Sequence, residues 1–155
     1  MKLATVFAFA LAAVGTNASA IGKRQSCPEA VRFGIPHIVP SDLQPGTDFT
    51  INVDFGCAVN YFGIIPRYID FYIEVPSGNN GYEPPILLAR RDFGVPAPPL
   101  SPAFTFTGQF PHYSFTEGAA YDIATNIIYP VNGTDGSEVL IQGGVTYLPI
   151  TVTSS

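Results

Sequence analysis

The stretch YIDFYIEV, residues 68–75, alternates apolar and polar side chains without a break. One side of it carries Ile69, Phe71, Ile73 and Val75, and the other carries Tyr68, Asp70, Tyr72 and Glu74. A period of two is typical of a β-strand with one buried face. The run PSGNNG, residues 76–81, is a turn signal that ends the strand. The stretch therefore predicts a half-buried strand, with Asp70 and Glu74 as solvated charges on its outer face.

The same alternation recurs on both sides of this stretch. Residues 49–55 alternate directly after the turn signal Pro45-Gly46. Further candidate strands are residues 86–91, 104–107, 119–129, 139–142 and 145–152. Seven to eight short strands separated by turn signals predict an all-β fold, an immunoglobulin-like or fibronectin-like β-sandwich. Because Pro149 has no amide N–H, the last strand is expected at a sheet edge or on a bulge.

One corner of the predicted sandwich has a more specific pattern. Residues 115–121, FTEGAAY, resemble the corner before the sixth strand of immunoglobulin-like and fibronectin-like domains. In those domains a tyrosine hydroxyl bonds back to the upstream backbone, and we expect Tyr121 to do so here. The proline-rich residues 95–102 predict an extended loop.

The pattern of the N-terminal residues predicts a secretion signal rather than part of the fold. Residues 1–20 contain Lys2, a short apolar run and small side chains up to Ala20, as in a signal peptide cleaved after Ala20. The dibasic pair that ends at Arg24 predicts a second cleavage, which removes residues 21–24 as a short propeptide. An uncut, flexible terminus is the alternative. We expect a secreted, extracellular protein with no membrane anchor, in which residues 25–155 form one domain.

The charge balance excludes one class of partner. The 155 residues contain 7 basic and 12 acidic side chains, and the net charge is -5. Residues 25–155 keep four arginines, no lysine and all 12 acids, which makes their net charge −8. Nucleic-acid binding needs a basic stripe that displaces counterions, and no such stripe is present in the sequence.

Two sequence features predict covalent modification. Cys27 and Cys57 are the only cysteines, and an even pair in an oxidising compartment predicts a disulfide. Closing a loop of about 31 residues is expected to stabilise the fold by about 3–4 kcal/mol. Asn132-Gly133-Thr134 is an N-glycosylation sequon in a turn-like stretch, so Asn132 is a predicted glycan site.

The sequence offers little catalytic chemistry. Its two histidines, His37 and His112, lie far apart, and neither a nucleophile-elbow motif nor a histidine metal-binding motif is present. Asp70 and Glu74 would lie about 13 Å apart along one strand, too far to act as a glycosidase pair. We therefore expect a protein that is not an enzyme, with no metal and no cofactor.

Aromatic and arginine residues outside the strand cores suggest a binding surface. The candidates are Tyr61, Phe62, Tyr82, Arg90, Arg91 and Tyr113. The four aromatic residues would suit a flat platform for stacking sugars, as in a cell-wall or carbohydrate-binding module. Together with the two arginines they would equally suit a protein interface, where tyrosine and arginine are enriched. The sequence leaves both readings open.

The layout of residues 34–153 resembles the necrosis-inducing secreted protein family of plant-associated fungi. The resemblance rests on the Pro45-Gly46 turn before the first strand, the Tyr68-Ile69-Asp70 strand, the proline-rich middle and the strand at residues 119–129. It implies a secreted fungal effector, a virulence protein that binds a host protein and suppresses plant immune signalling. Receptor-associated kinases would be candidate partners, and the host cytoplasm a candidate destination. We expect the protein to be a monomer.

Overall fold

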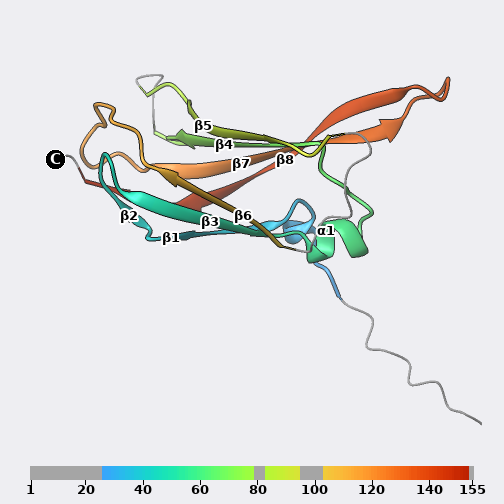
Figure 1. Cartoon of the computed structure of the whole chain (residues 1–155), viewed down its shortest axis with the longest axis horizontal. Helices are drawn as coiled ribbons and strands as arrows, with labels where there is room; N and C mark the ends of the chain where they lie inside the picture. Colours follow the sequence, from blue (N-terminus) through green and yellow to red (C-terminus); the bar gives the residue numbers. More distant parts are fainter. Residues whose placement is uncertain (1–25, 79–82, 95–102, 154–155) are drawn as a thin grey trace, which may run out of the picture.

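Two antiparallel sheets lie face to face in the computed structural model, which describes residues 26–78, 83–94 and 103–153 (Figure 1). The smaller sheet has the strand order β1-β3-β6, namely Ile35–Val39, Asp48–Asp54 and Ala103–Gln109. The larger sheet has the order β5-β4-β7-β8, namely Ile86–Asp92, Tyr68–Glu74, Asp122–Asn132 and Glu138–Pro149. The predicted all-β sandwich is confirmed, whereas its immunoglobulin-like type stays a prediction.

Short elements complete the sandwich. β2 (Asp42–Leu43) pairs in parallel with β9 (Thr151–Val152). The 3-10 helix η1 (Glu29–Val31) precedes β1, and the five-residue helix α1 (Gly56–Asn60) follows β3. No helix among the described residues is long and apolar enough to cross a bilayer.

The core fills the space between the two sheets with the apolar residues that alternate along each strand. Phe71 of β4 lies nearly parallel to Phe104 and Phe106 of β6, with ring centroids 6.4 and 5.8 Å away. The ring of Phe71 is fully buried. The period of two in residues 68–75 therefore determines which side chains of this stretch are buried between the two sheets.

Several strands differ from the prediction. β1 and β2 were not expected, because Pro36 interrupts the pattern of the first and the second has only two residues. Proline is tolerated in β1 because β1 is an edge strand. The two strands expected within residues 139–152 are mainly one long strand, β8, with a register shift opposite the segment between Asn126 and Ile128. β8 is an edge strand, as Pro149 predicted.

Asp70 is a correction to the sequence interpretation. It was expected to be a solvated charge, but its side chain is only 2% exposed. The register places Asp70 opposite Arg90 of β5, and the long arginine side chain covers it. The alternation predicted the correct face of the sheet, yet it could not show that a neighbouring strand would cover the carboxylate.

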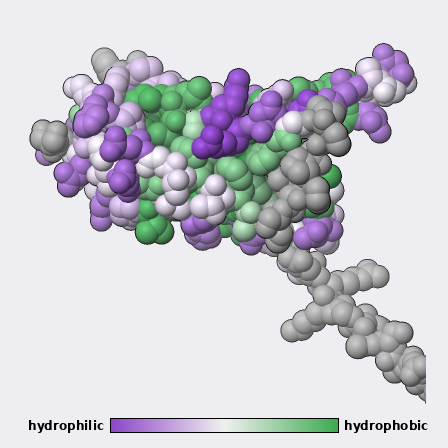
Figure 2. All heavy atoms as spheres, in the orientation of Figure 1, coloured by the Kyte–Doolittle hydropathy of each residue, from purple (hydrophilic) through white to green (hydrophobic). Residues whose placement is uncertain are grey.

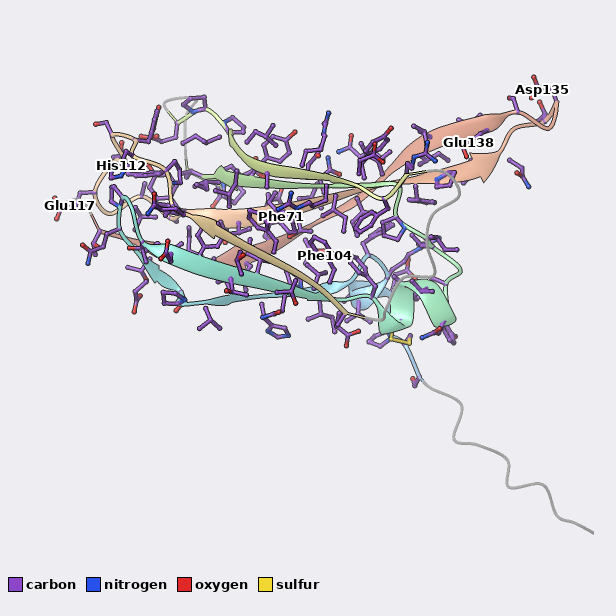
Figure 3. All side chains as sticks on the ribbon, in the orientation of Figure 1. Phe71, Phe104, His112, Glu117, Asp135 and Glu138 are labelled. Carbon is purple, nitrogen blue, oxygen red and sulfur yellow. A yellow bond between two sulfur atoms is a disulfide. The ribbon has the colours of Figure 1, made fainter. Side chains whose placement is uncertain are left out.

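The disulfide between Cys27 and Cys57 is confirmed. It joins the segment before η1 to α1, directly after β3, and its Cα atoms lie 5.7 Å apart (Figure 3). The N-terminal segment is thereby tied to the end of an early strand, as expected. The predicted cleavage positions Ala20 and Arg24 lie outside the described residues.

Tyr121 makes the expected backbone contact. The amide N–H of Thr116 donates to the hydroxyl oxygen of Tyr121 at 2.9 Å, and the ring of Phe115 meets the tyrosine ring edge-on. Burial raises the pKa of the Tyr121 hydroxyl above its ordinary value. The corner before β7 is therefore closed by a side chain that spans five residues.

Substitution Tyr121→Phe should lower the free energy of unfolding by about 1 kcal/mol, because one partly buried amide loses its acceptor. Urea denaturation of both proteins measures the difference. Tyr61→Phe is the matched control, since Tyr61 is exposed and its change should be within about 0.5 kcal/mol. Equal stability of Tyr121→Phe and the parent protein would contradict the assigned role.

Candidate functional site

The predicted aromatic residues do not form one platform. Tyr61 and Phe62 follow α1 and pack edge to face, with ring centroids 4.9 Å apart. Phe62 also packs against the core and carries the guanidinium of Arg32 over its ring. Tyr61 alone of this pair is well exposed.

Tyr113 lies at the other end of the sandwich. Its neighbour His112 and the helix α1 are at opposite ends of the molecule (Figure 3). The reason is topological: α1 follows the end of β3, and β6 runs antiparallel to β3, so the loop after β6 begins where β3 starts. Tyr82, the fourth predicted aromatic, lies outside the described residues.

Arg90 and Arg91 point to opposite faces of the larger sheet, as consecutive residues of a strand must. The guanidinium of Arg91 lies 4.7 Å from the ring centroid of Phe106, at the margin of the core. Arg90 lies on the outer face and donates two hydrogen bonds of 2.7 Å to the carboxylate of Asp70. These bonds and the charge of Asp70 raise the pKa of Arg90 above its ordinary value. Among the residues predicted to form a binding surface, Arg90 is therefore the one that lies within a larger group of polar and aromatic side chains.

This group of residues lies on the outer face of the four-stranded sheet. We call this surface the tyrosine face, and it includes Tyr68, Tyr72, Arg90, Asn126, Leu140, Gln142, Val145 and Tyr147. Sheet register aligns residues from three strands that are distant in the sequence. Ala124 of β7 lies between Tyr72 of β4 and Tyr147 of β8. Asn126 lies between Asp70 and Val145 one pair further along. The small side chain at residue 124 leaves room between the two tyrosines.

Two open depressions lie side by side on the tyrosine face. The first, about 440 Å³, is lined by Tyr68, Arg90, Ile128, Leu140 and Gln142. The second, about 320 Å³, shares Gln142 and includes Tyr72, Glu74, Asn126, Val145 and Tyr147. Loop-based reasoning missed most of these residues, although the outward positions of residues 68–75 did place three of them on this face.

The polar groups of the second depression are unevenly satisfied. Partial burial, together with the nearby Glu74 carboxylate, raises the pKa of the Tyr147 hydroxyl. The side-chain oxygen of Asn126 is buried and has no hydrogen-bond partner among the described residues. A buried acceptor without a partner costs free energy, so the site would gain from a ligand or water that donates to it.

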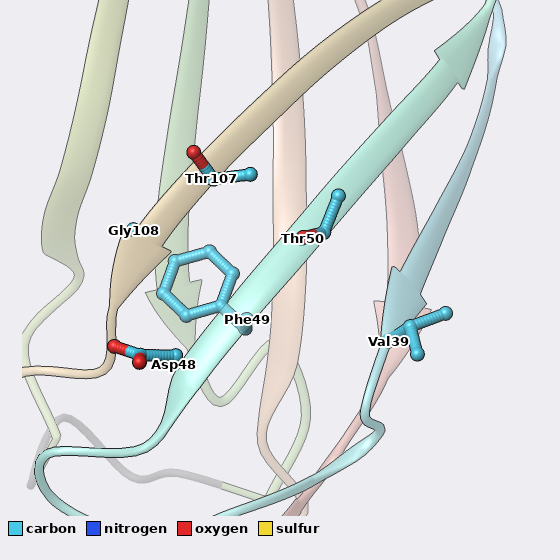
Figure 4. Close-up of a pocket in the computed structure, with 6 residues that line it drawn as sticks. All are labelled: Val39, Asp48, Phe49, Thr50, Thr107 and Gly108. Carbon is cyan, nitrogen blue, oxygen red and sulfur yellow. The ribbon is translucent and has the colours of Figure 1, made fainter.

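The outer face of the three-stranded sheet has a different chemistry. Thr50 lies opposite Thr107, and the hydroxyl of Thr105 donates to the side chain of Asn52 at 2.8 Å. An open depression of about 420 Å³ at one end is lined by Val39, Asp48, Phe49, Thr50, Thr107 and Gly108 (Figure 4). Phe49 is buried, so this face offers small polar groups rather than exposed aromatic rings.

The described residues contain no group of three or more histidine, cysteine, aspartate or glutamate side chains that could hold a metal ion. His37 lies on β1, whereas the ring of His112 lies close to Gly46. The two histidines therefore belong to separate places in the fold.

Comparisons with known proteins add little. No family model matches the chain, and no curated protein matches it. Among solved structures, the superoxide reductase (neelaredoxin) from Ignicoccus hospitalis is 18% identical, with a TM-score of 0.38 over 76% of this chain and 80% of that chain. A variant of the same protein is 17% identical, with a TM-score of 0.39, 77% of this chain and 81% of that chain. Both likenesses are too weak to support an inference about this protein.

Proposed function

We propose that this protein is a secreted fungal effector that binds a host protein through the tyrosine face and thereby suppresses plant immune signalling. It acts as a binder rather than as an enzyme, and receptor-associated kinases are the candidate partners. The observation that supports the proposal is the tyrosine face itself. This continuous sheet surface combines tyrosines, exposed aliphatic residues and Arg90, whose guanidinium is oriented by its hydrogen bonds to Asp70.

The residue types on this face are those of protein interfaces. Tyrosine and arginine are enriched among the few residues that contribute most of the binding energy in protein complexes. Tyr147 is 48% exposed, Val145 in the same depression is also exposed, and so is Leu140 in the neighbouring depression. The two depressions are open and adjacent, which suits the convex surface of a protein better than the enclosure of a small molecule.

The side chain of Arg90 is already oriented for contact with a partner protein. A guanidinium has five N–H donors, and Asp70 accepts from two of its nitrogens. The two-point contact restricts the orientation of the side chain, and about half of that side chain remains exposed. The free donors can meet carbonyl or carboxylate groups of a partner at a smaller cost in side-chain entropy.

A plant oxidative-burst assay and a pull-down from plant extract test the proposal together. The parent protein should suppress the burst and capture a host protein. Tyr147→Ala should weaken that capture by at least about tenfold, since a hot-spot tyrosine contributes roughly 2 kcal/mol or more.

Tyr113→Ala is the matched control, because Tyr113 is 42% exposed but lies outside the tyrosine face. It should retain capture and burst suppression. The proposal fails if the parent protein neither suppresses the burst nor captures a host protein. The tyrosine face is the wrong surface if both variants behave alike.

A carbohydrate-binding module is the second candidate, and one observation favours it. Tyr72 and Tyr147 flank Ala124 in the same depression that includes the side-chain amides of Asn126 and Gln142. Aromatic rings stack on sugars while amides hydrogen-bond to hydroxyls. Binding to insoluble chitin or glucan that is lost in Tyr147→Ala but kept in Tyr113→Ala would assign the face to a polysaccharide.

A further inference from the structure

The hairpin of β7 and β8 extends past the end of the three-stranded sheet (Figure 1). In this part, residues 138–142 of β8 pair with residues 128–132 of β7 on one side only. β8 is the edge of its sheet, and no described backbone hydrogen bond joins residues 138–142 to any strand but β7. Among the described residues, the other side of this segment is therefore an open strand edge.

The open edge is unusually apolar. Val139, Leu140 and Ile141 are 43%, 45% and 39% exposed, although they are consecutive. Alternation puts Leu140 on one face and its two neighbours on the other, so both faces of the hairpin are exposed here. Three consecutive exposed apolar residues are rare unless they serve a function.

Charge and proline, two common protections of an edge strand, are missing between Glu138 and the register shift at Gly143 and Gly144. Natural edges carry lysine, inward charges or proline that discourage pairing with another chain. Residues 139–148 contain no charged residue and no proline. Hydrophilic residues gather at the tip of the hairpin, around Asp135 (Figures 2 and 3).

The regular part of the strand edge ends at Gly143 and Gly144. The ring of Phe33 packs on both glycines so closely that a Cβ atom at either would lie 2.7 or 2.8 Å from it. The register of β8 against β7 also shifts there. Pairing with another strand is thus confined to residues 138–142.

We propose that, in place of the monomer expected from the sequence, this edge pairs antiparallel with the same edge of a second copy, on a two-fold axis at Leu140. Leu140 then faces its own counterpart, Val139 faces Ile141, and Glu138 faces Gln142. The contact is isologous and closes at two copies. It joins the two four-stranded sheets into one of eight strands and supplies partners to the open backbone groups.

Charge favours this register despite the acidic chain. Each Glu138 meets an amide, and the two Glu138 residues are offset by four residues, about 13 Å along the strand. That distance exceeds the Debye length of about 8 Å at physiological ionic strength. The segment therefore complements itself without placing like charges opposite each other.

The dimer would also change how the tyrosine face is presented. A two-fold axis perpendicular to a continuous sheet keeps both outer faces on the same side. Two binding surfaces would then act together, which raises avidity for a clustered partner. The pairing itself does not depend on the proposed function.

Sedimentation velocity between about 1 μM and about 1 mM tests the pairing, a range that covers weak to moderate dimers. The parent protein should double its mass with rising concentration, and more readily at high salt, which screens the net negative charge of each copy. Leu140→Glu should weaken dimerisation at least tenfold, since two carboxylates would meet at the axis. Leu87→Glu, on the opposite edge of the same sheet and similarly exposed, should leave the dimer intact.

A charge-exchange pair tests the register. Val139→Lys and Ile141→Glu should each weaken the dimer, whereas their equimolar mixture should restore it through lysine–glutamate contacts between unlike copies. A parent protein that is monomeric throughout, equal effects of Leu140→Glu and Leu87→Glu, or a mixture that stays monomeric would each overturn the proposal. Failure of host binding would instead appear in the Tyr147→Ala and burst measurements.

Discussion

Substitution Phe71→Ala should lower the free energy of unfolding by about 3–5 kcal/mol, the cost of emptying a large aromatic site in a packed core. Phe71 is fully buried and lies against Phe104 and Phe106, so its ring is the main aromatic link from β4 to β6. Removing it leaves both neighbouring rings facing a cavity between the two sheets. Urea denaturation followed by tyrosine fluorescence measures the loss.

Leu87→Ala is the matched control for this substitution. Leu87 lies on β5, the strand beside β4, but it is 51% exposed. Its truncation should change the free energy of unfolding by no more than about 0.5 kcal/mol. A loss below 1 kcal/mol for Phe71→Ala would mean that the sandwich core is not packed around this ring.

The double substitution Cys27→Ala, Cys57→Ala should cost about 3–4 kcal/mol. The two cysteines are 30 residues apart, and their bond restricts the unfolded chain over that loop. Freed of it, the unfolded state gains entropy while the strands of the folded state keep their contacts. Thermal and urea unfolding of the oxidised parent and the double variant measure the difference.

Reduction of the parent protein is the control for the disulfide prediction. The reduced parent should unfold at the same urea concentration as the double variant, since both lack the same constraint. Unchanged stability of the double variant would contradict the role assigned to the disulfide. A variant that is much less stable than the reduced parent would instead point to a packing role for the sulfur atoms.

Part of the fold follows from local patterns. Alternation in residues 49–55 and 68–75 predicted β3 and β4, because a period of two aligns apolar side chains on one face of a strand. The contact of Tyr121 and the pairing of the two cysteines were also predicted correctly. β1 was missed because Pro36 interrupts its alternation. Near the C-terminus, Gly143-Gly144 resembled a turn between two strands, but the two glycines form a bulge within the single strand β8.

The candidate site was predictable to a smaller extent. Arg90 was singled out as an arginine suited to an interface, and the structure places it on the tyrosine face. The aromatic residues Tyr61 and Tyr113 were grouped because both lie beside loops, yet the loops belong to opposite ends of the sandwich. Proximity in a sandwich depends on which strands pair, and that information is not local.

The sequence by itself determined the β class, the strand faces and the covalent link, because each depends on the residue types within a short window or on a single cysteine pair. Only the tertiary structure decided that Asp70 is covered by Arg90, that Tyr72 and Tyr147 flank Ala124, and that residues 138–142 form an open edge. The physical reason is that these features arise between β4, β5, β7 and β8, which sheet register brings together across long stretches of chain.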